Sequence, residues 1–262
     1  MRNPMLHAGL LLAMLAAATP VAADVVLPPA IAASPRLKDL RRSMMAGREL
    51  SDSQLQVLAD AGEGLAAARY ARRLEERGLV EYLDDAAHYY SIAVYADREF
   101  AIPRLVAILR GGEAEFGPAR LRNIREVLDR EARTDPVAAA GLAELLLRGK
   151  PFEQDVPRAR ELLLAAAEAG DFKAGIRLAQ SHFTGAPGLP PDPEAARRPL
   201  ELALSSPDPG VQSIARTLLN RLPGGVPEFP AAPSAMAAED WTTVSLSLRP
   251  RLRPETLQGA TR

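Results

Sequence analysis

The sequence predicts an all-α protein in which about four to five helix-turn-helix repeats stack into a right-handed α-solenoid. Two observations predict this fold: a motif recurs every 35 to 37 residues, and the apolar spacing within each copy is that of one face of a helix. Between residues 35 and 222, no segment shows the period-two alternation that is typical of strands. Because a hairpin of two short amphipathic helices cannot bury its apolar face alone, successive hairpins have to stack.

The repeated motif begins with a small apolar residue and has further apolar residues four, five and eight positions later. Residues at this spacing share one face of a helix. Successive copies begin 35, 37, 36 and 37 residues apart, a regularity that the abundance of alanine and leucine does not explain. A glycine follows most copies, and glycine ends a helix because it adopts the left-handed conformation without a Cβ clash. The copies begin at Ala66, Ala101, Ala138, Ala174 and, more faintly, Val211.

A second set of helices is expected between the copies of the motif. Asp155 and Asp192 each precede an apolar segment, and a proline follows each of them within two residues. Aspartate caps a helix by accepting a hydrogen bond from an orphan backbone N–H, and proline is tolerated at the first helical positions. The dipeptides Asp135-Pro136 and Asp208-Pro209 predict two further helix starts in the same way. The repeating unit is therefore a helix, a turn with glycine, a capped helix and a short turn.

Residues 1–23 have the features of a secretory signal peptide. Arg2 supplies a positive charge, Leu6 to Ala18 are apolar apart from one histidine, and Val21-Ala22-Ala23 fits the small-residue cleavage rule. We therefore expect cleavage after Ala23 and a periplasmic or secreted mature chain without a membrane span. The alternative is an uncleaved anchor, but the apolar run is shorter than the roughly 20 residues that a spanning helix needs.

The rest of the chain divides into three parts. Residues 24–50 are expected to form an N-terminal capping segment, with a short helix from Pro35 to Met45, and residues 51–222 the helical repeats. Residues 223–262 are rich in proline and are expected to form a disordered tail. Within this tail, Trp241 to Leu248 alternates apolar and polar residues, so the alternative is a segment that pairs as a strand or packs back on the solenoid.

Composition and charge exclude several classes of function. The 262 residues include 32 basic and 33 acidic side chains, so the chain lacks the positive surplus of a nucleic-acid-binding protein. The absence of cysteine excludes disulfides, thiolate metal sites and a cysteine nucleophile. No hydrolase or metal-ligand motif occurs, so we expect no enzymatic activity, no cofactor and no metal site. His182 occupies a core column of its helix, where we expect a buried, hydrogen-bonded side chain rather than a metal ligand or pH sensor.

The aligned apolar positions of the repeated motif, called here its packing columns, resemble those of Sel-type repeats, the Sel-one-like branch of the tetratricopeptide superfamily. Asp85 to Ala93 matches the aromatic pair in the second helix of that family, and Ala165 to Asp171 matches its Ala-Ala-x-x-Gly ending. The resemblance extends from about residue 55 to residue 220. It weakens from Pro118 to Arg130, where a degenerate joint is expected and the repeat count stays open.

This resemblance implies a protein-interaction scaffold without catalytic activity. Exported members of the family act in envelope assembly, in polysaccharide export or as periplasmic regulators of sensor kinases. The implied partner is therefore an envelope protein, namely a sensor, a receptor or an export component.

The resemblance also implies a concave groove that is lined by the first helix of each repeat. Residues beside the packing columns are expected to face it, and they combine apolar and charged side chains, which suits a helix or an extended peptide. The main candidates are Arg72, Glu75, Ala107, Arg110, Glu144, Leu147, Gln180 and Phe183. Further candidates at related positions are Leu65, Ala68, Phe100, Val137, Ala140, Lys173 and Ile176. The alternative is that Leu147, Ile176 and Phe183 complete the core.

The function that these features predict is that of a periplasmic adaptor or regulator, which binds a protein segment in the groove. The alternative is a structural scaffold of an envelope or exopolysaccharide-export complex, which uses its convex surface and its tail. A cell-wall hydrolase, or an activator of one, is a third hypothesis, for which the residues offer no mechanism. The oligomeric state is left open.

Overall fold

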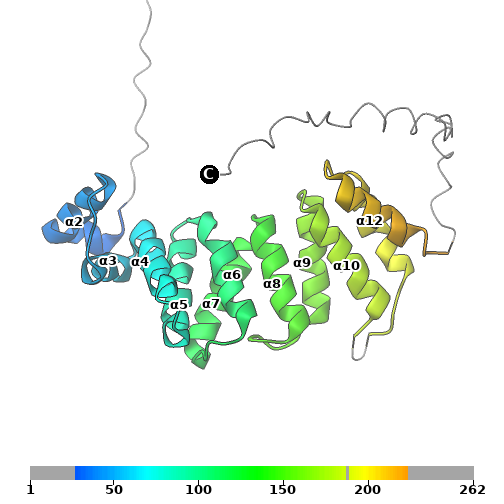
Figure 1. Ribbon diagram of the computed structural model, residues 1–262, viewed down its shortest axis with the longest axis horizontal. Coiled ribbons are helices and arrows are strands. Elements are labelled where there is room, and N and C mark those ends of the chain that lie inside the picture. The colour runs from blue at the N-terminus through cyan, green and yellow to red at the C-terminus, as the bar shows by residue number, and fades with distance from the viewer. Residues whose placement is uncertain (1–26, 187–188, 224–262) are drawn as a thin grey trace, which may run out of the picture. The chain divides into compact units, whose positions relative to one another are not determined.

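The structure is a computed structural model that describes residues 27–186 and 189–223. The described residues fall into two compact units, each treated separately below: residues 27–128 with 150–152, and residues 129–149 with 153–223. The ribbon is shown in Figure 1. The expected signal peptide (1–23) and all but the first residue of the expected tail (223–262) lie outside the described residues.

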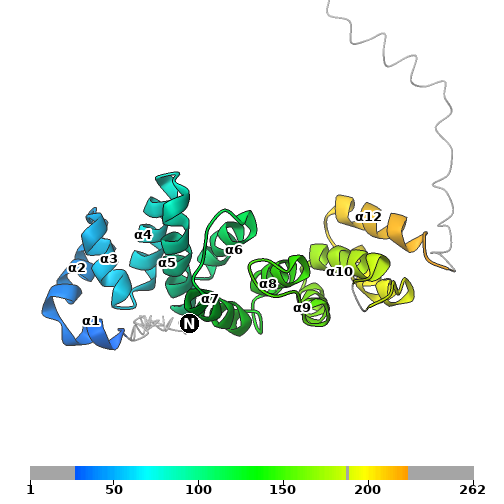
Figure 2. The same cartoon turned by 90° about the horizontal axis from the view of Figure 1, so that it is seen from below.

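The first unit consists of successive helices that pack on their neighbours in the chain. Its elements are α1 (Pro29–Ala33), α2 (Pro35–Met45), α3 (Asp52–Asp60), α4 (Gly64–Glu76), η1 (Val80–Tyr82), α5 (Leu83–Tyr95), η2 (Glu99–Ala101), α6 (Ile102–Gly111) and the greater part of α7 (Pro118–Glu131). Helix α4 packs against both α3 and α5, and α5 packs against α6. The pair α4 and α5 lies side by side in both views of the ribbon (Figure 1, Figure 2).

The second unit has the same construction. Its elements are the end of α7, α8 (Pro136–Arg148), α9 (Val156–Glu168), α10 (Phe172–Thr184), η3 (Glu194–Ala196), α11 (Arg197–Leu204) and α12 (Pro209–Leu219). Each of the helices α8 to α12 packs on the next. Among the described residues the only β-type pairing is one isolated bridge, between Ala186 and Leu189. The predicted all-α fold of helical repeats is therefore confirmed.

The columns of the repeated motif form the core of both units. In α8 the motif residues Ala138, Leu142, Ala143 and Leu146 are fully buried. The corresponding residues of the copies in α4, α6 and α10 are buried as well, except Tyr70 and His182, which are half-buried. In the fainter copy in α12, Val211, Ala215 and Leu219 are buried, but Arg216 at the remaining position is exposed. Burial of each leucine contributes about 1.5–3 kcal/mol relative to exposure. The spacing of the motif thus identified the buried face of each first helix.

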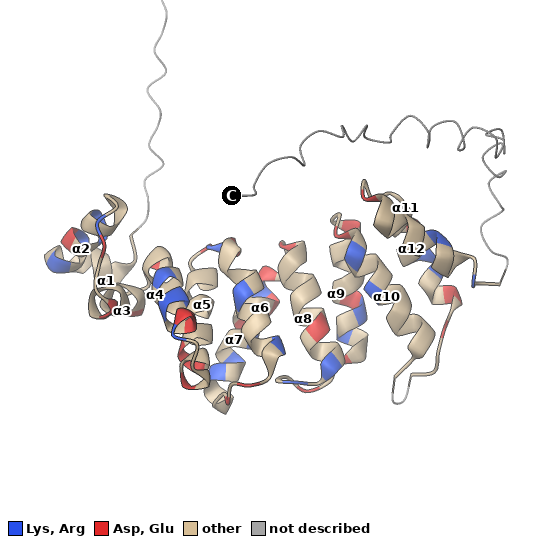
Figure 3. Ribbon diagram, viewed as in Figure 1, with Lys and Arg blue, Asp and Glu red and all other residues tan. Residues whose placement is uncertain are grey.

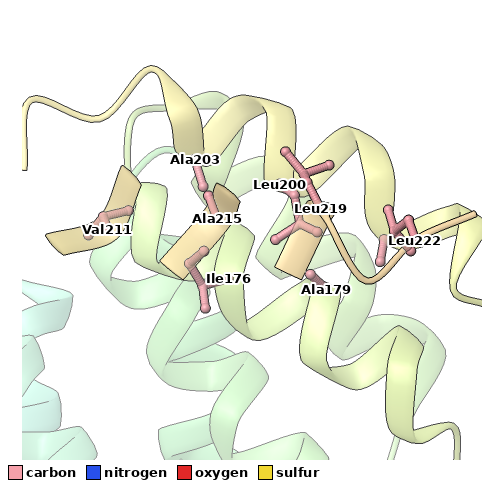
Figure 4. Packing of buried hydrophobic residues seen from close by; sticks show 9 residues of the cluster. Ile176, Ala179, Leu200, Ala203, Val211, Ala215, Leu219 and Leu222 are labelled. Carbon is pink, nitrogen blue, oxygen red and sulfur yellow. The ribbon is translucent and has the colours of Figure 1, made fainter. Parts of the chain in front are cut away.

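The C-terminal core shows how three helices share these columns. Ile176 and Ala179 of α10 meet Leu200 and Ala203 of α11, and α12 completes the cluster. In Figure 4 these side chains point toward one another between the three helices. The contributors from α12 and the following turn are Val211, Ala215, Leu219 and Leu222.

The predicted turns and caps are present. The side chain of Asp135 accepts hydrogen bonds from the backbone N–H groups of Val137 and Ala138, at 2.6 and 2.9 Å. Asp155 and Asp208 cap α9 and α12 in the same way. Asp192 accepts from the backbone N–H of Ala195, but the turn of 3-10 helix η3 precedes α11 there. Gly149 ends α8 with φ of 71°, in the left-handed conformation that the motif requires.

The N-terminal region contains more helix than the sequence predicted. The expected helix from Pro35 to Met45 is present as α2. Helix α1 was not predicted, and α3 lies at the start of residues 51–222, where helical repeats were expected but no helix was placed at residues 52–60. Helix α3 begins at a capping box, in which Ser51 accepts from the backbone N–H of Gln54 and the Gln54 side chain accepts from the N–H of Ser51. The boundary between the two units falls within α7, in the segment where the repeat pattern weakened.

Candidate functional site

Four of the eight main groove candidates line two pockets, one in each unit. The first, called here the α8–α10 pocket, has a volume of about 490 Å³. It brings together three main candidates, Glu144 and Leu147 of α8 and Gln180 of α10. Arg148, Arg177 and Thr184 are among the other residues that line it. The first helices of two successive repeats therefore contribute to one surface.

The α8–α10 pocket combines an ion pair with apolar surface. A carboxylate oxygen of Glu144 lies 3.8 Å from the Arg177 guanidinium, so the pair bridges α8 and α10. Leu147 is half-buried, and its backbone carbonyl accepts a hydrogen bond of 2.7 Å from Gln154. Ser181 lines the pocket and is largely buried, and Arg160 of α9 donates to both its side-chain and its backbone oxygen. This arrangement offers charged, amide and apolar groups to one bound segment.

The second pocket, called here the α4 pocket, lies in the first unit and has a volume of about 580 Å³. Arg72 of α4 lines it together with three of the further candidates, Leu65, Ala68 and Phe100. Residues 47–50, in the loop after α2, line it as well. Arg72 forms an exposed ion pair of 2.9 Å with Glu76, four residues later on the same helix.

Four main candidates line neither of these two pockets. The Glu75 carboxylate accepts a hydrogen bond of 2.8 Å from the Tyr90 phenol, and it lies 3.5 Å from the guanidinium of Arg104. Burial, and then the Glu75 carboxylate, raise the pKa of Tyr90. Glu75 therefore connects α4 to α5 and α6. Ala107 is half-buried and Arg110 is exposed on α6.

Phe183 is the fourth of these residues, and it contacts the core. Its ring packs against the C-terminal cluster, and the guanidinium of Arg221 lies 5.8 Å from the ring centroid. Ile176 is 8% exposed and belongs to the same cluster. Phe183 and Ile176 therefore pack in the core, as the alternative to the groove assignment predicts. Leu147, the third residue of that alternative, lines the α8–α10 pocket instead.

The two histidines of the described residues belong to different units. His182 is half-buried, and its Nδ1 atom finds no hydrogen-bond partner there, so the hydrogen bond expected from its core position is absent at this atom. Burial, followed by the charge of Arg160, lowers the pKa of His182. His88 packs beside the ring of Tyr89, and its pKa is lowered mainly by burial. Residues 27–186 and 189–223 hold no group of three potential metal ligands.

Sequence analysis did not identify two arginines of the α4 pocket. Arg48 lies in the loop after α2, and Arg69 lies on α4 beside a packing column, but neither stands at a position that the repeat pattern marks. A capping interaction was also missed. The buried carboxylate of Glu63 accepts from the backbone N–H of Ala66 at 2.9 Å and pairs with Arg41 at 3.3 Å.

Comparison with known proteins identifies the repeats. Residues 136–171 and 174–204 match the Sel1 repeat family. The chain contains two Sel1 repeats. The matched repeats contain α8 with α9 and α10 with α11, so both sides of the α8–α10 pocket come from Sel1 repeats. Sel1 repeats generally mediate protein–protein interaction. The match covers less of the chain than residues 55–220, over which the resemblance was expected.

Two solved structures are similar to this chain. One is a Sel1 repeat protein from Oxalobacter formigenes, with 19% identity, a TM-score of 0.47 and coverage of 71% of this chain and 52% of the other. The other is c5321, a protective antigen of uropathogenic Escherichia coli strains with an SLR fold, with 19% identity, a TM-score of 0.41 and coverage of 72% and 45%. The chain thus spans about half the length of these two proteins. No curated protein matches it. In the described part of the chain, no helix is both long and apolar enough to cross a membrane.

Proposed function

We propose that this protein is a non-enzymatic adaptor or regulator, which binds a segment of an envelope protein through the first helices of its repeats. In this proposal it acts in the periplasm or outside the cell, after removal of residues 1–23. The observation that carries the proposal is the α8–α10 pocket, because two consecutive Sel1 repeats contribute to it.

The chemistry of the pocket supports a protein segment as its ligand. Glu144 and Arg177 present opposite charges, Gln180 presents an amide, and Leu147 adds apolar surface. A peptide offers complementary groups of all three kinds along its length, whereas a carbohydrate has no apolar side chain for Leu147. Peptide recognition by helical repeats uses such mixed surfaces, with anchors in pockets and polar contacts around them.

The test is capture of the partner from crosslinked native cells with the chain tagged at its C-terminus, followed by mass spectrometry. The Glu144→Lys variant places a positive charge beside Arg177, so we expect it to lose most of the captured partner. The matched control is Glu161→Lys on α9, where the glutamate also pairs with an arginine, Arg158, at 3.0 Å but lines neither pocket. Circular dichroism of both variants checks that helicity is retained.

The outcomes separate the hypotheses. Loss of one stoichiometric envelope protein from Glu144→Lys, but not from Glu161→Lys, supports the adaptor. Equal capture by both variants contradicts the assignment of the pocket. Capture of a group of export or wall-synthesis proteins that survives Glu144→Lys, but is lost on deletion of residues 224–262, would instead favour a structural scaffold.

A further inference from the structure

The α4 pocket has an excess of positive charge that the fold does not neutralise. Four arginines and two glutamates line it. Two of the arginines are paired: Arg72 with Glu76 at 2.9 Å, and Arg73 with Glu49 and Asp52 at 3.1 and 2.8 Å. Figure 3 shows the basic positions of α4, followed by acidic positions at its C-terminal end.

The remaining two arginines, Arg48 and Arg69, form no ion pair with any described residue. Arg69 donates one hydrogen bond, of 3.5 Å, to the backbone carbonyl of Met44. Both residues are exposed on the pocket wall, Arg48 from the loop after α2 and Arg69 from α4. Because a guanidinium binds a carboxylate through two parallel hydrogen bonds, two such groups facing one pocket suit a ligand with more than one carboxylate.

The same pocket contains apolar surface between and beside the charges. Leu50, Leu55 and Leu65 belong to its lining. Phe100 lines it as well and is 62% exposed, among the most exposed large apolar side chains of the described residues. Leu50 and Leu55 are buried, so the apolar surface open to a ligand is that of Phe100 and the half-buried Leu65. An anionic polysaccharide would satisfy the arginines but has no side chains to cover these two residues. A peptide in which acidic and apolar residues alternate satisfies both.

We propose that the α4 pocket is a second docking surface, which binds an acidic and apolar segment of a protein partner through Arg48 and Arg69. This second site goes beyond the proposed function, because it lies in the first unit and its ligand is specified as negatively charged. The loop after α2 becomes part of the recognition surface, so the segment that was expected only to cap the repeats also contributes to binding.

The experiment measures binding of a fluorescein-labelled peptide of alternating Glu and Leu to the full chain by fluorescence anisotropy. A matched peptide with Gln in place of each Glu tests the role of charge. The Arg48→Glu, Arg69→Glu double variant should weaken binding of the acidic peptide by about tenfold or more, because like charges would then face each other. Binding by the wild-type chain should also fall as the salt concentration rises.

The control is the Arg36→Glu, Lys38→Glu double variant. It changes the net charge by the same amount on α2, where both residues are exposed and neither lines the α4 pocket. We expect it to bind the acidic peptide within about twofold of the wild type, since distant surface charges are screened. If the Glu double variant loses helicity, the Arg48→Gln, Arg69→Gln variant replaces it, with the same direction expected.

Three results would overturn the proposal: no binding of the acidic peptide, equal binding of the Gln peptide, or unchanged binding by the arginine variants. Displacement of the peptide by polygalacturonate at lower concentration than by unlabelled peptide would also overturn it, in favour of a polysaccharide site. None of these results bears on the α8–α10 pocket, which is tested by Glu144→Lys.

Discussion

His182 illustrates how a single residue departs from the repeat that contains it. It stands in α10 at the position of Leu146 in α8, which is fully buried. The imidazole is half-buried, and its Nδ1 has no hydrogen-bond partner among the described residues. The positive charge of Arg160 disfavours protonation of the ring. Burial and Arg160 both disfavour the protonated ring and so lower the pKa of His182 below its ordinary value of 6.5, against a smaller opposing effect of Asp192.

The first prediction is that His182 makes the protein less stable in acid. The unfolded chain takes up the proton near pH 6.5, whereas the folded protein takes it up only at lower pH. The stability due to neutral His182 is therefore complete above about pH 6.5 and is lost as the pH falls through the lowered pKa. In His182→Leu, the free energy of unfolding should fall less than in the wild type between about pH 7.5 and pH 5. Urea unfolding at both values measures this difference, and His88, whose pKa is also lowered, is unchanged in the two proteins. Parallel losses in both proteins would contradict the assignment.

At the scale of helices, one glycine sets the distance between α10 and its neighbours. A Cβ on Gly175 would lie 2.7 Å from the backbone carbonyl oxygen of Pro199 in α11 and 3.6 Å from the Cβ of Ala167 in α9. The first contact is shorter than van der Waals distance and involves backbone, which cannot rotate away. The close packing of α10 on α11 therefore requires glycine at this position.

The second prediction concerns Gly175→Ala. Alanine in place of glycine within a helix ordinarily stabilises by about 0.5–1 kcal/mol. Here we expect instead a net loss of about 1–3 kcal/mol, because α10 and α11 have to move apart. Gly111→Ala, in the last turn of α6, is the control, since a Cβ there would meet nothing within 4 Å. Urea unfolding of both variants measures the effect, and an unchanged or raised stability of Gly175→Ala would show that the helices adjust freely.

The helices also show what could be predicted from the sequence. The spacing of small and large apolar residues identified the buried faces of α4, α6, α8, α10 and α12, because this spacing is the direct consequence of helix geometry. The short N-terminal helices α1 and α3 were missed, since neither carries the motif. Helix α3 could have been found from Ser51 and Gln54, which have the spacing of a capping box.

The candidate surface was predicted less completely than the fold. Glu144, Leu147 and Gln180 do share a pocket, because repeat periodicity places them at related positions of α8 and α10. Glu75 occupies in α4 the register position of Leu147 in α8, but its carboxylate accepts a hydrogen bond of 2.8 Å from Tyr90 of α5. Such a contact depends on the polar side chain that the next helix places nearby. The repeat pattern, which describes apolar positions, does not predict that side chain. Arg48 lines the α4 pocket from the loop after α2, and the helical repeat pattern predicts no residue positions in a loop.

At the scale of the whole molecule, each unit is held together by contacts between elements that are close in the chain. In the first unit α3, α4, α5 and α6 pack in sequence, and in the second unit α8 to α12 do the same. Stability in such repeats is approximately a sum of the stabilities of single repeats and of their nearest-neighbour interfaces. Damage to one hairpin should therefore remain local, with its effect decreasing along the chain.

The last prediction tests this locality with Leu200→Ala in α11. The Leu200 side chain is fully buried between α10 and α12, so its truncation should cost about 2–5 kcal/mol through lost burial and a cavity. Amide hydrogen exchange should accelerate in α11 and α12, less in α10, and not in α4 and α5, because the loss is confined to the C-terminal hairpin and its neighbour. Ile214→Ala is the control, as this α12 side chain is 49% exposed and should change exchange little. Uniform acceleration in both units would mean that the chain unfolds as one cooperative block, and then a partner bound at either pocket would stabilise every repeat equally.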